Sequence, residues 1–217
     1  MVFGEICYAL SMQSPLRTNE SSVDISGPVG KLEGIFADNN PDKVAIICHP
    51  DPQQQGTMNN KVVTTLARSY EHKGISTLRF NYRGVGNSEG QYGHVQGEIQ
   101  DGKAALTWLK NKGFTTFYLA GFSFGSYIAT ALNQEVEAKS LLIVAPPVKR
   151  FDFSSIWPDA TPAYIFQGEK DDVVMCQDVL MFVQQHPRIY CHIFHGTGHF
   201  FHGKLPLLQH QILSLLS

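Results

Sequence analysis

Short apolar runs of β type alternate with segments of helical periodicity along most of this 217-residue chain. The expected strands lie at residues 44–48, 76–80, 116–120, 141–145, 163–167 and 189–194, and the expected helices at 60–73, 98–112, 124–134, 176–185 and 205–216. Strands joined by crossover helices form parallel sheets that are covered on both faces. The sequence therefore predicts an α/β fold with a mostly parallel, twisted sheet between two layers of helices.

A pair of short β stretches precedes this alternation, over residues 23–37. Gly27, Pro28 and Gly30 lie between the two stretches and are typical of a turn. We therefore expect an antiparallel hairpin at one edge of the sheet. Residues 1–22 are expected to form a flexible lead-in, so that a single domain spans 23–217, which is long enough to bury a large core.

Charge and composition restrict the partners. The formal net charge is −2 and no basic run or stripe occurs, so nucleic acid is not an expected partner. No apolar stretch approaches the ~20 residues of a membrane span. Residues 1–10 carry no Lys or Arg and are too short for a secretory signal, which indicates a cytoplasmic protein.

The four cysteines are scattered, without the paired spacing of a metal site. Neither a metal nor an organic cofactor is expected. The sequence leaves the oligomeric state open.

Residues 121–125 read Gly-Phe-Ser-Phe-Gly, after an expected strand and before a helix. This is the setting of a nucleophile elbow. Ser123 sits on so sharp a turn that side chains two positions before and after it would collide, which explains Gly121 and Gly125. The helix that follows favours negative charge at its N-terminus, and the amide of Phe124 can donate to an oxyanion.

A second match to the same pattern covers residues 86–90 and has Ser88 at its centre. It lies in a glycine-rich stretch that includes Gly84, and no apolar helix begins there. Ser123 is therefore the predicted nucleophile and Ser88 the alternative. A purely structural glycine turn is the non-catalytic interpretation of 121–125.

A serine hydroxyl needs a base, and in this type of sheet the acid and then the histidine follow the serine along the chain. The loop after 163–167 carries Glu169, Asp171 and Asp172, and His195, His199 and His202 follow the strand 189–194. We predict His199 as the base, because Gly196 and Gly198 allow its short loop a tight approach. We predict Asp171 as the acid that holds the imidazole in one tautomer. The other carboxylates and histidines of these loops stay as alternatives.

The second oxyanion donor is expected from the loop after 44–48, which reads His-Pro-Asp-Pro at 49–52. Prolines have no N–H, so Asp51 carries the only amide from 50 to 52, and we predict that it is this donor. The alternative is a proline-stiffened turn with no catalytic donor.

The connection 146–162 is too short for a separate cap domain. It contains Phe151, Phe153 and Trp157, which either pack in the core beneath a loop or form an apolar wall for a short acyl chain. An open site of this kind suits a small ester or thioester.

Seven segments together resemble the small, lidless bacterial-type α/β-hydrolases related to dienelactone hydrolases and serine carboxylesterases. They are HPDP (49–52), MNNKVV (58–63), LRFNYRGVG (78–86), GFSFG (121–125), VAPPV (144–148), GEKDDVV (168–174) and GHFFHG (198–203), spread over most of 23–217. The resemblance implies an α/β-hydrolase fold, a triad of Ser123, Asp171 and His199, and oxyanion donors at the amides of Asp51 and Phe124. The related dienelactone hydrolases use cysteine as the nucleophile, where this chain carries serine.

These observations predict a serine hydrolase that cleaves a small carboxylic ester through an acyl-enzyme intermediate. A thioesterase or a small peptidase would use the same triad, because the acyl half-reaction is shared. A binding module on the same fold, without catalysis, is the alternative from a different class, although such a module has no need of an intact serine, histidine and acid.

Overall fold

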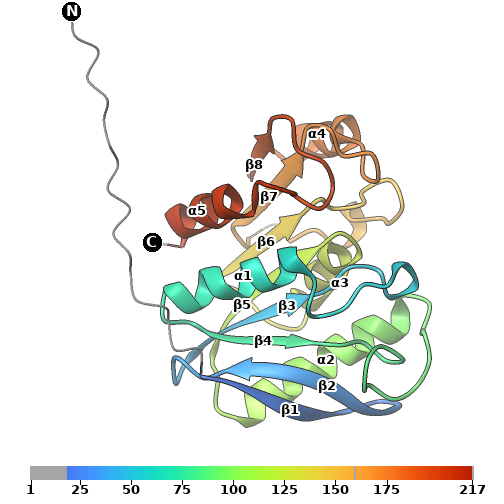
Figure 1. Cartoon of the computed structure of the whole chain (residues 1–217), viewed down its shortest axis with the longest axis vertical. Coiled ribbons are helices and arrows are strands. Elements are labelled where there is room, and N and C mark those ends of the chain that lie inside the picture. Colours follow the sequence, from blue (N-terminus) through green and yellow to red (C-terminus); the bar gives the residue numbers. More distant parts are fainter. Residues whose placement is uncertain (1–18, 159, 217) are drawn as a thin grey trace, which may run out of the picture.

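The computed structural model describes residues 19–158 and 160–216. One eight-stranded sheet runs through it in the order β1-β2-β4-β3-β5-β6-β7-β8 (Figure 1). The strands are β1 (Glu20–Gly27), β2 (Gly30–Ala37), β3 (Lys43–Cys48), β4 (Ser76–Phe80), β5 (Thr116–Phe122), β6 (Ser140–Val144), β7 (Ala163–Gly168) and β8 (Ile189–Phe194). From β4 to β8 every neighbouring pair is parallel, as the sequence predicts.

The expected edge hairpin is formed by β1 and β2, which pair antiparallel from Glu20 opposite Ala37 to Gly27 opposite Gly30. Most of the expected lead-in lies outside the described residues. However, β1 already begins at Glu20 rather than at residue 23, because the hairpin register gives Glu20 a partner at the end of β2. The hairpin joins the parallel strands through an antiparallel pairing of β2 with β4.

Helices cover both faces of the sheet (Figure 1). On one face lie α1 (Lys61–His72) and α5 (Leu205–Leu215), and on the other lie α2 (Gln96–Asn111), α3 (Phe124–Leu132) and α4 (Cys176–Gln185). Each face has its own apolar core: Leu66 and Ile212 pack in one, and Leu106 and Ile128 in the other. Burial of these cores stabilises the sheet and fixes the loops that follow its strands. Within the described ranges, every helix is too short or too polar to cross a membrane.

The carboxyl ends of the parallel strands meet at one edge of the sheet, where ligands bind in folds of this kind. The residues just after β3, β5, β7 and β8 include Asp51, Ser123, Asp171 and His199. The connection from β6 to β7 carries a single short 3-10 helix, η2 (Ser154–Ile156), in its described part. This edge is therefore not covered by a cap domain.

Candidate active site

Ser123 occupies a strained turn between β5 and α3. Its φ is 53° and its ψ is −122°, a region that side-chain-bearing residues rarely adopt. Its N–H donates to the carbonyl of Val144 at 2.8 Å, which ties the turn to β6. A β-carbon at Gly121 would lie 2.2 Å from the carbonyl oxygen of Gly125, so the turn closes only with glycine at that position. The strain holds the Ser123 hydroxyl above the sheet.

The hydroxyl of Ser123 meets the imidazole of His199. Oγ of Ser123 lies 3.1 Å from Nε2 of His199, and Nδ1 of His199 lies 2.8 Å from Oδ2 of Asp171. All three side chains are buried. The structure therefore brings together the three residues predicted as a triad, with the base in reach of the nucleophile and the acid behind the base.

Four donors surround the carboxylate of Asp171. Oδ1 accepts the backbone N–H groups of Val173 and Val174, and Oδ2 accepts His199 and also Nε2 of Gln167 at 3.2 Å. Burial raises the pKa of Asp171, but the hydrogen bonds from His199 and the two amides outweigh it, so the pKa lies below the ordinary value. The acid is thus held as a carboxylate.

Gln167 contacts this acid, which the sequence does not predict. It is fully buried in β7, and its amide nitrogen also donates to the carbonyls of Gly168 and Val174. The signal was a lone amide side chain at the end of an apolar strand, next to the acid loop. Such a group must find buried partners, and the loop carrying Asp171 provides them.

The loop after β3 lies directly against the elbow. A β-carbon at Gly125 would come 2.2 Å from the carbonyl oxygen of Cys48, so this glycine lets the two segments touch. Among the described residues, no hydrogen bond uses the N–H of Asp51. Phe124 is the first residue of α3, so its N–H has no acceptor within the helix. Both amides predicted as oxyanion donors are therefore without an acceptor in the described part of the chain, and their role in an oxyanion hole stays a prediction.

His49 holds the shape of this loop. It is fully buried, with Nδ1 2.7 Å from the carbonyl oxygen of Pro50, and its Nε2 accepts the N–H of Tyr82 at 3.2 Å. Desolvation lowers the pKa of His49 to about 3, against the smaller opposing effects of Pro50 and Asp51. The imidazole is therefore neutral, with its proton on the nitrogen that faces Pro50.

Solved structures of other proteins share this architecture. A structure of an α/β serine hydrolase homologue from Coxiella burnetii is 41% identical, covers 94% of this chain and 100% of its own, and superposes with a TM-score of 0.86. An α/β serine hydrolase without a lid from Xanthomonas campestris is 35% identical over 90% of this chain and 92% of its own, with a TM-score of 0.84. The chain belongs to the lidless α/β serine hydrolases.

An uncharacterized protein of Rickettsia prowazekii is also similar to this hydrolase, with 37% identity over 195 residues, 82% of this chain and 81% of the relative. No family model matches the sequence.

The residues considered as alternatives to His199 and Asp171 lie elsewhere in the hydrolase. His195 is exposed and lies 3.3 Å from Glu169, whose second oxygen accepts the N–H of Gly196. Asp172 and His202 are exposed. Among the described residues, no hydrogen bond joins any of these side chains to Ser123. In addition, no group of three or more His, Cys, Asp or Glu within the described ranges could hold a metal ion.

Ser88, at the centre of the second glycine pattern, is buried in a polar network. Its hydroxyl donates to the carbonyl of Asn81 at 2.8 Å and accepts the N–H of Glu33 at 2.9 Å. The carboxylate of Glu33 in turn accepts hydrogen bonds from the side-chain amide of Asn81 and from the backbone and side-chain N–H groups of Asn87. Ser88 thus joins the loop after β4 to β2, the inner strand of the edge hairpin. In the described part of the chain, no histidine hydrogen-bonds to its hydroxyl.

A hollow of about 260 Å³ opens beside Ser123. It is lined by Ser123, Pro147, Lys149, Arg150, Val173, Val174, Met175 and Asp178. Its apolar wall therefore comes from the loop between β7 and α4 and from Pro147. The wall predicted from the aromatic residues of 146–162 is not found in this hollow.

Those aromatic residues pack beneath the loop instead. Phe151 lies edge-on to Phe124 with ring centroids 5.7 Å apart. Phe153 is buried, and Trp157 packs against Phe182 of α4 at 5.1 Å. The structure therefore favours the core-packing alternative for all three.

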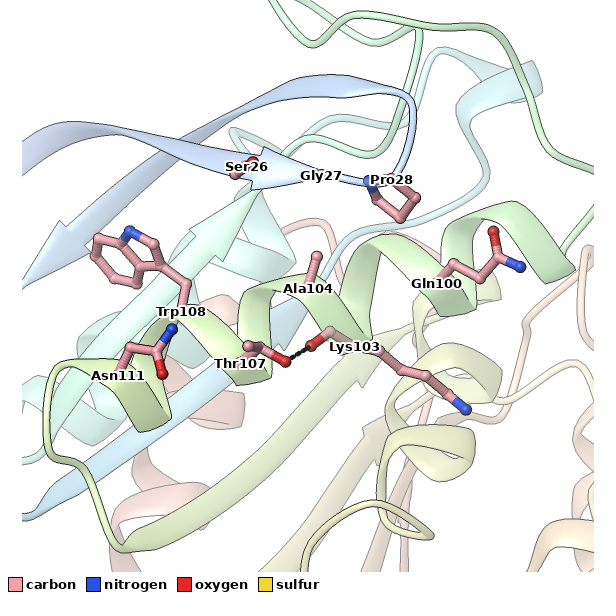
Figure 2. Close-up of a pocket in the computed structure, with 9 residues that line it drawn as sticks. All are labelled: Ser26, Gly27, Pro28, Gln100, Lys103, Ala104, Thr107, Trp108 and Asn111. Carbon is pink, nitrogen blue, oxygen red and sulfur yellow. Dashed lines mark hydrogen bonds between the residues drawn. The ribbon is translucent and has the colours of Figure 1, made fainter.

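A larger groove, of about 540 Å³, lies between the end of β1 and α2 and shares no lining residue with the hollow at Ser123 (Figure 2). Figure 2 shows Ala104 and Trp108 pointing from α2 toward β1. Lys103 is the one titratable residue in its lining. The groove thus offers apolar surface and no catalytic constellation.

Proposed function

We propose that this hydrolase cleaves small carboxylic esters through an acyl-enzyme, with Ser123 as nucleophile, His199 as general base and acid, and Asp171 as the residue that orients the imidazole. The observation that carries the proposal is the buried chain of contacts from Oγ of Ser123 through His199 to Asp171. A hydroxyl becomes a competent nucleophile when a base takes its proton, and this base is in hydrogen-bond reach.

The reaction would run in two halves. Oγ of Ser123 attacks the ester carbonyl as its proton moves to Nε2 of His199, and the carbonyl oxygen becomes an oxyanion. The amides of Asp51 and Phe124 donate to that oxygen, each contribution being worth roughly 3–4 kcal/mol. His199 then gives the proton to the departing alkoxide. Water, deprotonated by the same histidine, attacks the acyl-enzyme and releases the acid and free Ser123.

The size of the hollow supports a small substrate. Its 260 Å³ lies below the range of about 300–1,000 Å³ that encloses drug-sized ligands, and its apolar side is short. The substrate class we propose is an ester of a short acyl chain. A thioester presents the same carbonyl, so the leaving group is to be surveyed with matched esters and thioesters.

The test uses a fluorophosphonate probe, with the labelled residue mapped by mass spectrometry. We expect labelling at Ser123, loss of labelling and of p-nitrophenyl acetate hydrolysis in Ser123→Ala, and retention of both in Ser88→Ala. Ser88 is the matched control because it sits in the same Gly-x-Ser-x-Gly pattern. An unlabelled wild-type protein that is folded by circular dichroism would instead favour a binding module on this fold.

A further inference from the structure

Asp51 carries two groups with opposite effects on a developing oxyanion. Its amide is the predicted donor, whereas its carboxylate is a negative charge on the same residue. This carboxylate is buried, its side chain being 7% exposed. A charge in such a position is screened little by water and would repel the negative tetrahedral intermediate. The loop therefore needs a cation close to Asp51.

Arg150 provides this cation. Its Nη1 lies 2.7 Å from Oδ2 of Asp51, across 99 residues of sequence. The other oxygen of Asp51 accepts the N–H of Gln53 at 2.9 Å and caps the 3-10 helix η1 (Pro52–Gln54). The carboxylate is thus held by the loop on one side and by Arg150 on the other.

Aromatic rings support the guanidinium of Arg150. It lies 4.9 Å over the ring of Phe151, which stacks on Tyr127 at 4.8 Å and meets Phe124 edge-on. Arg150 also lines the hollow that contains Ser123. Because Phe124 is the residue with the other predicted oxyanion amide, the ion pair and its ring platform join both donor segments.

We propose that Arg150 is a positioning residue for the oxyanion hole: its guanidinium neutralises Asp51 and holds the 49–52 loop so that the Asp51 amide faces the reacting carbonyl. The inference rests on the proposed function of the site. It predicts an effect on the chemical step for neutral esters, rather than on the binding of charged ones.

The test compares Arg150→Met, Arg150→Lys and the double variant Asp51→Asn with Arg150→Met, on p-nitrophenyl acetate. We expect Arg150→Met to lower kcat about tenfold with KM changed less than about twofold, a smaller effect than the roughly 100-fold loss of a whole oxyanion donor. Arg150→Lys keeps the charge and should retain at least about a third of kcat. The double variant keeps the amide and the cap but leaves no unpaired charge, so it should recover most of the activity lost in Arg150→Met.

Lys103→Met is the matched control, since Lys103 is also half-exposed and pairs with a carboxylate, Glu135 at 2.6 Å, but on α2. Its kcat should equal that of the wild type. Melting temperatures of all variants establish that they are folded.

Three results would overturn the inference: an Arg150→Met enzyme with wild-type kcat, a double variant no better than Arg150→Met, or an effect confined to KM for anionic esters. The second would mean that the unpaired charge of Asp51 is not the cause of the lost activity, and the third that Arg150 binds substrate charge. If the wild type is not labelled by fluorophosphonate at Ser123, the proposed function fails and the inference fails with it. A labelled wild type with an unaffected Arg150→Met variant overturns the inference alone.

Discussion

Oδ2 of Asp171 lies 2.8 Å from Nδ1 of His199, while Oδ1 of the same carboxylate is occupied by the amides of Val173 and Val174. The two oxygens thus have different tasks: one fixes the carboxylate to its own loop and the other orients the imidazole. Since the backbone holds Oδ1, the carboxylate cannot turn away from His199 without breaking both amide contacts.

Replacing this acid tests the assignment of roles. Asp171→Asn presents an amide nitrogen or a weaker acceptor to Nδ1 and favours the wrong tautomer of His199, so kcat should fall by about 10³–10⁴-fold. Asp172→Asn is the matched control, because Asp172 is adjacent but exposed, and its kcat should stay within about threefold of the wild type. Steady-state hydrolysis of p-nitrophenyl acetate measures both. The reverse order of effects would assign the acid to Asp172.

The sheet and the positions of Ser123, Asp171 and His199 could be predicted because their signals are local. Each lies in the loop after an apolar strand, and parallel strands bring such loops to one edge. The elbow glycines carry their own steric reason, which the structure confirms at Gly121, whereas at Gly125 the atom that a β-carbon would meet is the carbonyl oxygen of Cys48.

Long-range contacts had no such signal. The pairing of Arg150 with Asp51 joins loops 99 residues apart, and Gln167 reaches the acid through packing within β7. The aromatic residues of 146–162 were also ambiguous, because hydrophobicity predicts burial but not whether the neighbour is a helix or a substrate. The prediction that Gly196 and Gly198 allow a tight approach of the histidine loop is also wrong, because the close contact between the two loops occurs at Gly168.

Gly168 lets the acid loop touch the histidine loop. A β-carbon there would lie 2.4 Å from the carbonyl oxygen of Thr197, whereas at Gly198 the nearest atom would be 3.6 Å away. Gly168→Ala should therefore destabilise the fold by about 2–3 kcal/mol through a backbone collision. For a chain of this size that lowers Tm by roughly 5–10 °C.

Gly198→Ala is the control for this prediction, and we expect its Tm within about 2 °C of the wild type. Differential scanning calorimetry of the two variants gives the comparison. Equal Tm values for both would contradict the steric argument.

His49 makes the fold sensitive to mild acid. Its native pKa is about 3, while an unfolded histidine titrates near ~6.5. Between these values only the unfolded chain binds the proton, so the free energy of unfolding falls as pH falls from about 6.5 and stops falling near 3. From pH 7 to pH 5 this single group should lower the free energy of unfolding by on the order of 2 kcal/mol.

The measurement is urea unfolding of the wild type and of His49→Gln at pH 7 and pH 5. Glutamine can still donate to Pro50 and accept from Tyr82 but does not titrate, so the variant should lose less stability on acidification. The other histidines act in both proteins and cancel in the comparison. Parallel pH dependences would show that His49 is not the source.

The apolar wall of the hollow should set the acyl-chain preference. Val173 and Met175 are 62% and 57% exposed, so they are available to a substrate, and both line the hollow with Ser123. Removing side-chain methylenes from this wall takes away apolar contact with the acyl chain, and each buried CH₂ contributes about 0.8 kcal/mol of binding free energy. Met175→Ala should therefore lower kcat/KM for p-nitrophenyl butyrate about 3–10-fold relative to the acetate ester.

Trp157→Ala serves as the comparison, because Trp157 packs on α4 and does not line this hollow. It removes a larger apolar side chain, yet the butyrate-to-acetate ratio should stay at the wild-type value, even if Tm falls. Taking the ratio within each variant cancels any loss of active protein. A shifted ratio in Trp157→Ala together with an unchanged one in Met175→Ala would place the acyl chain beneath the 146–162 loop instead.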